Sequence, residues 1–164
     1  MWRRIWSNLF SEWFQLSRWF PESNMRHIRD VIAEGELHHA GELCFAVEAR
    51  YSLWALFNGI HTRRRAEQVF SSLGVWNTAD NSGVLVYLQM AERRIEIVAD
   101  RGIALKVPDS EWANLCNEFV DKMREIPADQ AVLDCLIKIN ALLALHFPAS
   151  EDNPKELTNE PIIL

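Results

Sequence analysis

Two short, continuous apolar runs constrain the fold of this chain more than any other feature. Residues 43–47 read Leu-Cys-Phe-Ala-Val, and residues 84–88 read Val-Leu-Val-Tyr-Leu. Apolar runs of this length, without alternation, are typical of strands covered on both faces. Between the two runs, the apolar residues of 61–73 recur at helical spacing until Gly74 ends the pattern. The sequence therefore predicts two parallel strands joined by a right-handed helical crossover.

A third strand is predicted at residues 95–99, where Ile-Glu-Ile-Val-Ala follows a turn at 91–94 and returns as a hairpin. Residues 103–107 are expected to form a short edge segment, and helices are expected to begin at Pro108 and Pro127. We therefore predict an α/β fold. Its mixed sheet of three to four strands is flanked by helices on both faces and preceded by an amphipathic helix. The expected units are residues 1–20 (helix), 21–148 (domain) and 149–164 (acidic flexible tail).

Composition narrows the class of protein. The chain has 164 residues, which suits one domain, and its net charge of −6 argues against nucleic acid as a partner. Its three cysteines form no CxxC pair and lie in apolar stretches, so they are expected to be buried thiols in a reducing cytoplasm. No continuous run of eighteen apolar residues occurs, which excludes an ordinary membrane-spanning helix.

The first twenty residues hold four of the seven tryptophans. Apolar positions that include Trp2, Trp6, Phe10 and Trp13 make an amphipathic helix the expected structure. Two interpretations remain open. The helix either lies in a membrane interface, peripheral to the inner membrane, or docks on its own domain or on a second copy. Docking is favoured, because interfacial helices usually carry more Lys and Arg than the three arginines present here.

Several strings in the chain resemble the TPM-domain family, in particular a short cytoplasmic bacterial branch without a signal peptide. They are residues 41–48, Arg65-Ala66, Val69-Phe70, residues 75–78, residues 81–85 and residues 95–103. The resemblance implies a mixed sheet flanked by helices. Some relatives are linked to calcium binding and others to acid phosphatase activity, including a phosphatase-like protein of the thylakoid lumen. The chain departs from the family pattern at Asn77, where an acid usually follows the tryptophan.

The predicted topology collects polar residues at one edge of the sheet. The starts of the two parallel strands and the end of the third strand meet there. The residues are His38, His39, Glu42, Asp80, Asn81, Asp100 and Arg101. Three carboxylates and an amide are ligands suited to Ca²⁺ or Mg²⁺. The alternative is that these residues shape turns and caps, with both histidines exposed.

The other end of the parallel strands offers Glu48 and Arg50, because ligands of open α/β sheets usually bind there. The alternative to a binding role is that Glu48 belongs to a surface ion pair. The run Arg63-Arg64-Arg65 is a candidate for holding a phosphate group, but three consecutive helix residues point in different directions, so a solvated helix face is favoured.

Two functional hypotheses follow. The first is an interaction module that meets a protein partner or the membrane through residues 1–20, with self-association as a further possibility. The second is a metal-dependent phosphatase that uses Glu42, Asp80, Asn81 and Asp100, with His38 or His39 carrying protons. Phosphate loops, dinucleotide fingerprints and nucleophile elbows are absent from the sequence, so whether the chain is an enzyme stays open.

Overall fold

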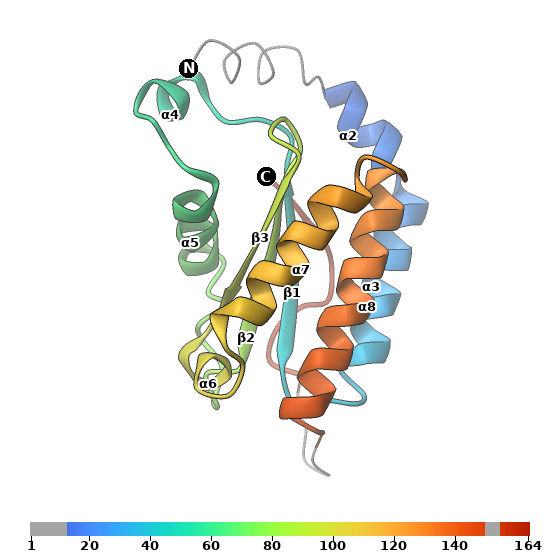
Figure 1. The fold of residues 1–164 in the computed structure, drawn as a ribbon, viewed down its shortest axis with the longest axis vertical. Coiled ribbons are helices and arrows are strands. Elements are labelled where there is room, and N and C mark those ends of the chain that lie inside the picture. Colours follow the sequence, from blue (N-terminus) through green and yellow to red (C-terminus); the bar gives the residue numbers. More distant parts are fainter. Residues whose placement is uncertain (1–12, 150–154) are drawn as a thin grey trace.

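A computed structural model describes residues 13–149 and 155–164, with side chains of 13–15 and 53–54 left out. Four strands form one sheet in the order β3-β2-β1-β4 (Figure 1). Their bounds are Glu42–Glu48 (β1), Gly83–Gln89 (β2), Arg94–Ala99 (β3) and Ile162–Ile163 (β4). β1 runs parallel to both β2 and β4, and β2 pairs antiparallel with β3. The predicted α/β class with a mixed sheet is confirmed.

The register explains why the two apolar runs are continuous. Glu42 is the partner of Gly83 and Glu48 is the partner of Gln89, so the central strands align over their full length. Both strands are buried at every position. A sheet position buried on both faces selects apolar side chains at consecutive residues rather than at alternate ones.

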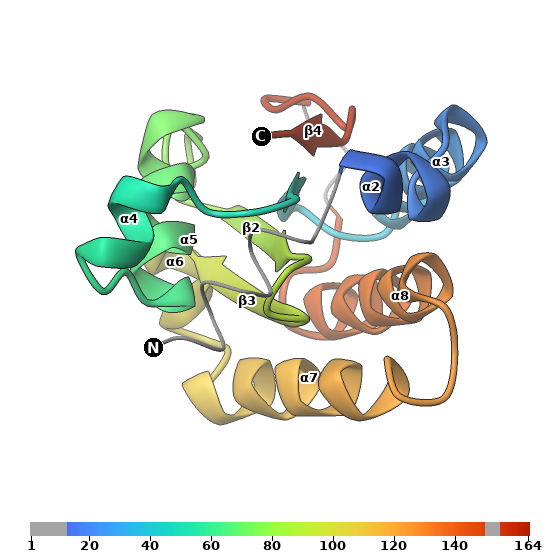
Figure 2. The same cartoon turned by 90° about the horizontal axis from the view of Figure 1, so that it is seen from above.

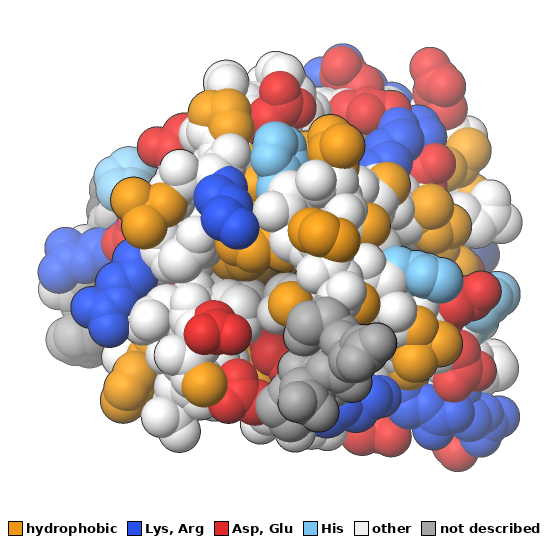
Figure 3. Space-filling model, turned by 90° about the horizontal axis from the view of Figure 1, so that it is seen from below, with side chains coloured by type: hydrophobic (Ala, Val, Ile, Leu, Met, Phe, Trp, Pro, Cys, Tyr) orange, Lys and Arg blue, Asp and Glu red, His pale blue; other side chains and the backbone are white. Residues whose placement is uncertain are grey.

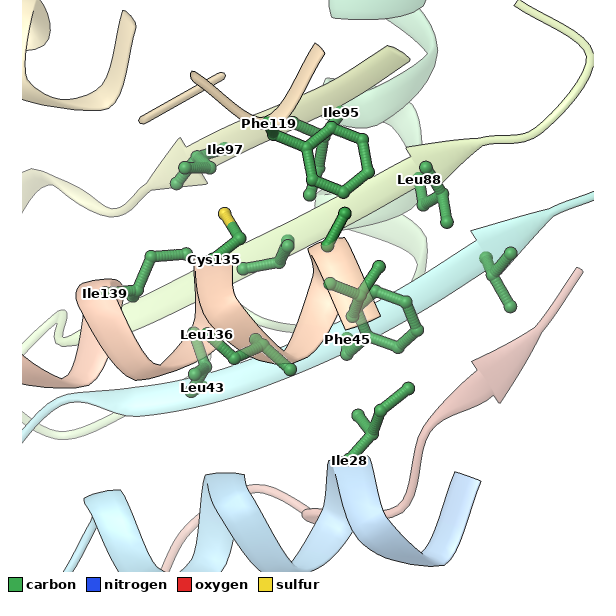
Figure 4. Close-up of a cluster of buried hydrophobic side chains, with 14 of the residues drawn as sticks. Ile28, Leu43, Phe45, Leu88, Ile95, Ile97, Phe119, Cys135, Leu136 and Ile139 are labelled. Carbon is green, nitrogen blue, oxygen red and sulfur yellow. The ribbon is translucent and has the colours of Figure 1, made fainter. Parts of the chain in front are cut away.

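Helices cover both faces of the sheet, as predicted (Figures 1 and 2). Their bounds are Trp13–Trp19 (α2), Glu22–Gly35 (α3), Leu53–Phe57 (α4), Thr62–Ser72 (α5), Arg101–Ala104 (α6), Asp109–Lys122 (α7) and Ala128–His146 (α8). The larger core lies between the sheet and α3, α7 and α8, and a smaller core lies under α5. Figure 4 shows Phe45, Phe119 and Leu136 in the larger core. Alternate residues of β1 serve the two cores: Leu43 and Phe45 face one, Cys44 and Ala46 the other.

The N-terminal helix is docked on the domain where it is described. Leu16 and Phe20 are each 3% exposed and belong to the larger core, where the Phe20 ring centroid lies 6.2 Å from that of Phe45. Ser17 and Arg18, on the other side of α2, are exposed. Of the aromatic residues expected to form the interaction face, Trp2, Trp6 and Phe10 lie outside the described residues, as does the Trp13 side chain.

Residues 155–164 pack against the domain and end in the sheet, which corrects for this part the flexible tail expected at 149–164. Residues 162–163 form β4 beside β1, and the Leu164 N–H donates to the Val47 carbonyl at 2.9 Å. Leu157 and Ile162 pack on the smaller core. The physical reason is that α5 packs against β2 and β3, so the remaining apolar surface on that face is covered by this segment.

Residues 103–107 also differ from the expectation of an edge segment. The chain turns into the short helix α6 directly after β3, since the Asp100 carboxylate accepts a hydrogen bond from the Arg101 N–H at 2.7 Å. The predicted helices after Pro108 and Pro127 are confirmed as α7 and α8.

The cysteines are free thiols, as expected. Cys44 and Cys135 are buried, while Cys116 is half-buried and packs against the larger core. Burial raises the pKa of Cys44 and of Cys116 to about 11 and that of Cys135 to about 12. Within the described ranges, no helix combines the length and apolar character needed to cross a bilayer.

Candidate functional site

The predicted edge site forms in part. Asn81, Asp100 and Arg101 converge where β2 begins and β3 ends. The Arg101 Nε donates to Asn81 Oδ1 at 2.8 Å, and the Asp100 N–H donates to the Gly83 carbonyl at 2.8 Å. Figure 3 shows this end of the molecule, where hydrophobic side chains are interspersed with acidic and basic ones rather than giving way to an acidic patch.

Gly102 allows the segment after β3 to lie directly against the turn before β2. A Cβ atom at Gly102 would lie 2.4 Å from the Asp80 carbonyl oxygen and 2.7 Å from that of Asn81. Only glycine permits this approach of two backbone segments. Asn81 adopts a φ of 52°, in the left-handed region that asparagine tolerates, so it is a turn residue as well as a candidate ligand.

Asp100 caps helix α6, in agreement with the alternative that the edge residues shape turns and caps. Its Oδ1 accepts from the Arg101 N–H, whereas its Oδ2 is buried and has no hydrogen-bond partner among the described residues. An unpaired buried carboxylate oxygen is costly, and such atoms are often found where an ion, water or ligand completes the shell.

Glu42 is engaged elsewhere. Its side chain is 3% exposed, and Oε2 accepts from the N–H groups of Glu156 at 3.2 Å and Leu157 at 2.9 Å. Glu36, which sequence reasoning missed, also binds a backbone N–H group. It is buried, and its Oε1 accepts from the Leu43 N–H at 3.1 Å. Burial raises the pKa of its carboxyl. Glu36 therefore holds a backbone N–H group at the start of β1, and Glu42 holds two from the C-terminal segment.

The two histidines have different environments. His38 is exposed as expected, but His39 is fully buried, which corrects the expectation that both are exposed. Its Nδ1 lies 3.0 Å from the Gly41 carbonyl oxygen and its Nε2 lies 3.1 Å from Asn140 Oδ1. Burial lowers the pKa of His39, and its contacts with Asn140 and Gly41 oppose that shift.

Fewer of the predicted site residues lie together than the sequence indicated. Asp80 is exposed on the surface, and Glu42 is bound to backbone N–H groups. Across residues 13–149 and 155–164, no three His, Cys, Asp or Glu side chains are grouped so that they could hold a metal ion. Asn81, Asp100 and Arg101 are the members that lie together.

The opposite end of the sheet carries a buried polar network. Glu48, at the end of β1, is paired with Arg65 of α5 through two contacts, Nε to Oε2 at 2.9 Å and Nη2 to Oε1 at 3.0 Å. The Tyr87 hydroxyl donates to the same carboxylate. Glu48 is 7% exposed, whereas the Arg65 side chain is 30% exposed, so the expected surface ion pair is half-buried with its carboxylate in the interior.

Two tyrosines extend this network. Burial raises the pKa of Tyr87, and the charge of Glu48 raises it further. Burial also raises the pKa of Tyr51 to about 12. Both phenols therefore stay protonated near neutral pH, and the Tyr87 phenol donates to Glu48. Sequence reasoning named Glu48 and Arg65 separately, but it missed their pairing and the role of both tyrosines, because these contacts join separate elements.

A pocket of about 520 Å³ opens beside this network, at the connection between β1 and α5. Its wall includes Glu48, Tyr51, His61, Arg64 and Arg65. The position is the carboxyl end of a parallel strand, where open α/β sheets usually bind ligands. α4 and the start of α5 lie at this end of the molecule (Figure 1).

The three consecutive arginines of α5 have three separate surroundings rather than one solvated face. Arg63 donates from Nη1 to the Ile97 carbonyl of edge strand β3 at 2.6 Å, and Arg65 pairs with Glu48. Arg64 is exposed at the pocket rim. A groove of about 570 Å³ between β3 and α7 is lined in part by Arg63, whose bond to Ile97 occupies one backbone acceptor of this edge strand.

The fold and these sites define an α/β domain with a mixed sheet, helices on both faces and polar sites at both ends of the strands. The family model described as "TPM domain" matches residues 22–142 of this chain. This chain belongs to the TPM-domain family, which confirms the resemblance.

The fold has a solved counterpart. The chain is similar to the BA42 protein from the psychrophilic bacterium Bizionia argentinensis, whose NMR structure superposes with a TM-score of 0.75. The two sequences are 28% identical over 86% of this chain and 92% of that protein. Among curated proteins, no sequence matches this chain.

Proposed function

We propose that this TPM-domain protein is an interaction module that contacts a protein surface through its tryptophan-rich N-terminal segment. The observation that carries the proposal is the anchoring of α2. Leu16 and Phe20 belong to the core, so the part of the chain that directly follows the tryptophans is fixed to the domain. In the sequence, Trp2, Trp6 and Trp13 recur at spacings compatible with one helical stripe that continues to Leu16.

A protein surface is favoured over a membrane as the partner. Residues 1–20 carry three arginines against one glutamate, which is few for a helix lying in an anionic interface. Exposed tryptophans are typical anchors of protein interfaces. A second copy of the chain is the partner that can be tested without other components.

The test compares the full chain with a Trp2→Ser/Trp6→Ser variant, which leaves Leu16 and Phe20 in place. Sedimentation velocity across a hundredfold range of concentration should show self-association in the full chain and its loss in the variant. Leu105→Ser, at a site 87% exposed on another part of the surface, is the matched control and should behave as the parent. A parallel arm measures pelleting with phosphatidylglycerol vesicles.

The outcomes separate cleanly. Self-association that needs the tryptophans supports the proposal. A monomer that pellets with vesicles only when Trp2 and Trp6 are present assigns the segment to membrane surfaces and contradicts the protein-surface proposal. A monomer that ignores vesicles contradicts both self-association and membrane binding through this segment.

A second candidate is a metal-dependent phosphatase, which the unpaired Asp100 Oδ2 favours. The next residue, Arg101, donates to Asn81 Oδ1 at 2.8 Å, which brings Asn81 to the same end of the sheet. With one carboxylate and one amide, the corner suits Mg²⁺ better than Ca²⁺. Mg²⁺ is commonly held by one or two carboxylates together with water and substrate phosphate, whereas Ca²⁺ needs about six to eight oxygen ligands.

The corresponding test is hydrolysis of p-nitrophenyl phosphate with Mg²⁺ or Ca²⁺. Asp100→Asn keeps a side-chain oxygen for the cap on α6 but loses the charge, so it should remain folded and lose turnover. Absence of turnover by the parent chain, together with no thermal shift on adding either metal, excludes this candidate.

A further inference from the structure

The C-terminal segment, residues 155–164, occupies the edge of β1 that faces away from β2. Residues 162–163 pair in parallel with Ala46 and Val47, and the Leu164 N–H donates to the Val47 carbonyl at 2.9 Å. The strand that the segment forms has two residues, whereas β1 has seven. The β1 edge is therefore a place where an extended strand binds, and the chain itself shows one strand that fits.

The first half of the same edge is closed by the domain. The Leu43 N–H donates to Glu36 Oε1 at 3.1 Å. Residues at even spacing along a strand direct their backbone N–H and C=O groups to the same side, so Leu43 and Val47 lie on one edge. Only the second half of β1 is left for the added strand.

The segment lies on the surface of the domain. None of residues 155–164 is buried, and Ile163 is 46% exposed, whereas every residue of β1 is buried. The segment also lies outside residues 22–142, the range that the family model matches and that contains β1, β2 and β3. Segments with few buried apolar contacts open at a lower free-energy cost than core elements. We therefore expect this segment to leave the β1 edge while the domain stays folded.

Polar groups of the domain hold the beginning of the segment. Glu42 Oε2 accepts from the N–H groups of Glu156 at 3.2 Å and Leu157 at 2.9 Å. The Ala79 N–H donates to the two carboxylate oxygens of Glu156 at 3.1 and 3.0 Å. The contact of Glu42 is with backbone groups and is available to other peptide sequences, whereas the contact of Ala79 requires a side-chain acceptor.

One charge and one apolar side chain fix the end of the segment. Arg29 Nη1 lies 3.5 Å from Glu160 Oε1, and both side chains are partly exposed, so this pair contributes little stability. Two residues later, Ile162 packs on the smaller core, to which its register partner Ala46 also belongs. The side chains contacted here are thus a carboxylate and, two positions later, a β-branched apolar residue.

We propose that the β1 edge is a binding site for an extended peptide of a partner protein, and that residues 155–164 occupy this site as an intramolecular competitor. The peptide runs parallel to β1 and has an acidic residue two positions before a β-branched apolar residue, as Glu160 and Ile162 are placed here. Strand addition at a sheet edge takes its affinity from backbone hydrogen bonds and its specificity from alternate side chains. The site uses neither the tryptophan-rich segment nor Asp100.

The test is an NMR titration of the ¹⁵N-labelled full chain with an unlabelled peptide that has the sequence of residues 155–164. The peptide should displace the labelled segment from the β1 edge. The amide resonances of Leu157 and Leu164 should therefore move saturably toward positions typical of an unstructured chain, while that of Val86 in β2 stays in place. The same peptide with Ile162→Asp should leave all three resonances unchanged.

Fluorescence anisotropy with a fluorescein-labelled peptide measures the competition. The full-length Ile162→Asp variant weakens the internal strand, so it should bind the peptide at least tenfold more tightly than the parent, because apparent affinity rises with the fraction of open sites. Ile137→Asp, at a site 56% exposed on α8, is the matched control and should bind as the parent. Circular dichroism checks that both variants are folded.

Displacement in the parent that requires the isoleucine of the peptide supports the proposal. Two results overturn it. One is the absence of saturable movement of the Leu157 and Leu164 resonances in a large excess of peptide. The other is equal affinity of the parent and Ile162→Asp, which would place the peptide elsewhere on the surface.

Discussion

Replacing Gly35 by alanine should destabilise this protein, although the general preference of helices predicts the opposite. Gly35 is the last residue of α3, where glycine is less favourable than alanine by up to about 1 kcal/mol. The structure places Asn140 of α8 directly against it. A Cβ atom at Gly35 would lie 2.1 Å from both Cγ and Nδ2 of Asn140 and 2.4 Å from its Oδ1.

The magnitude follows from what Asn140 must give up. Its Nδ2 donates to the Val31 carbonyl at 2.9 Å, and its Oδ1 contacts His39 Nε2 at 3.1 Å. Displacing the side chain breaks both contacts in a half-buried setting, at a cost of about 1–3 kcal/mol each. After subtracting the helical preference, Gly35→Ala should lose about 1–5 kcal/mol, or about 2–20 °C in melting temperature for a domain of this size.

Thermal unfolding followed by circular dichroism measures the effect, and a double-mutant cycle assigns its cause. Asn140→Ala removes the three atoms nearest to the new methyl group. In that background Gly35→Ala should be close to neutral or slightly stabilising. A single Gly35→Ala variant that melts at or above the parent temperature would show that the two helices do not meet as described.

Three further predictions concern buried polar groups. Glu42→Gln should weaken the bonds to the C-terminal segment by about 1–2 kcal/mol, seen as faster hydrogen exchange of the Leu157 amide with the core little changed. The pKa of His39 is lowered below its ordinary value of 6.5, so the unfolded state binds the proton first. Unfolding free energy should therefore fall as pH drops below about 6.5; His39→Gln should flatten that slope, and the exposed His38→Gln should not. Cys135, with a pKa of about 12, should resist Ellman's reagent at pH 8 until the protein unfolds, and rapid reaction would contradict its burial.

Part of the candidate sites was visible in the sequence. The topology brought Asn81, Asp100 and Arg101 to one edge as expected, because parallel strands and a hairpin leave no other place for those ends. The same reasoning could not tell whether Glu42 faces an ion or a backbone. Its partners, the N–H groups of Glu156 and Leu157, lie more than a hundred residues away in the chain.

The C-terminal segment shows the same limit. Its acidic composition and prolines are typical of a tail, and nothing local indicates a strand of two residues. It is ordered because the sheet face beside α5 needs a cover, and that need arises only once β1, β2 and β3 are assembled.

By itself, the sequence determined the α/β class, the order of the three main strands, the helices after Pro108 and Pro127, and the burial of Cys44 and Cys135. These features rest on apolar periodicity and on proline and glycine positions, which act over a few neighbouring residues. Only the tertiary structure decided which polar side chains bond to other parts of the fold and which face a pocket. That choice depends on contacts such as Glu48 with Arg65 and His39 with Asn140, which exist only after distant segments pack together.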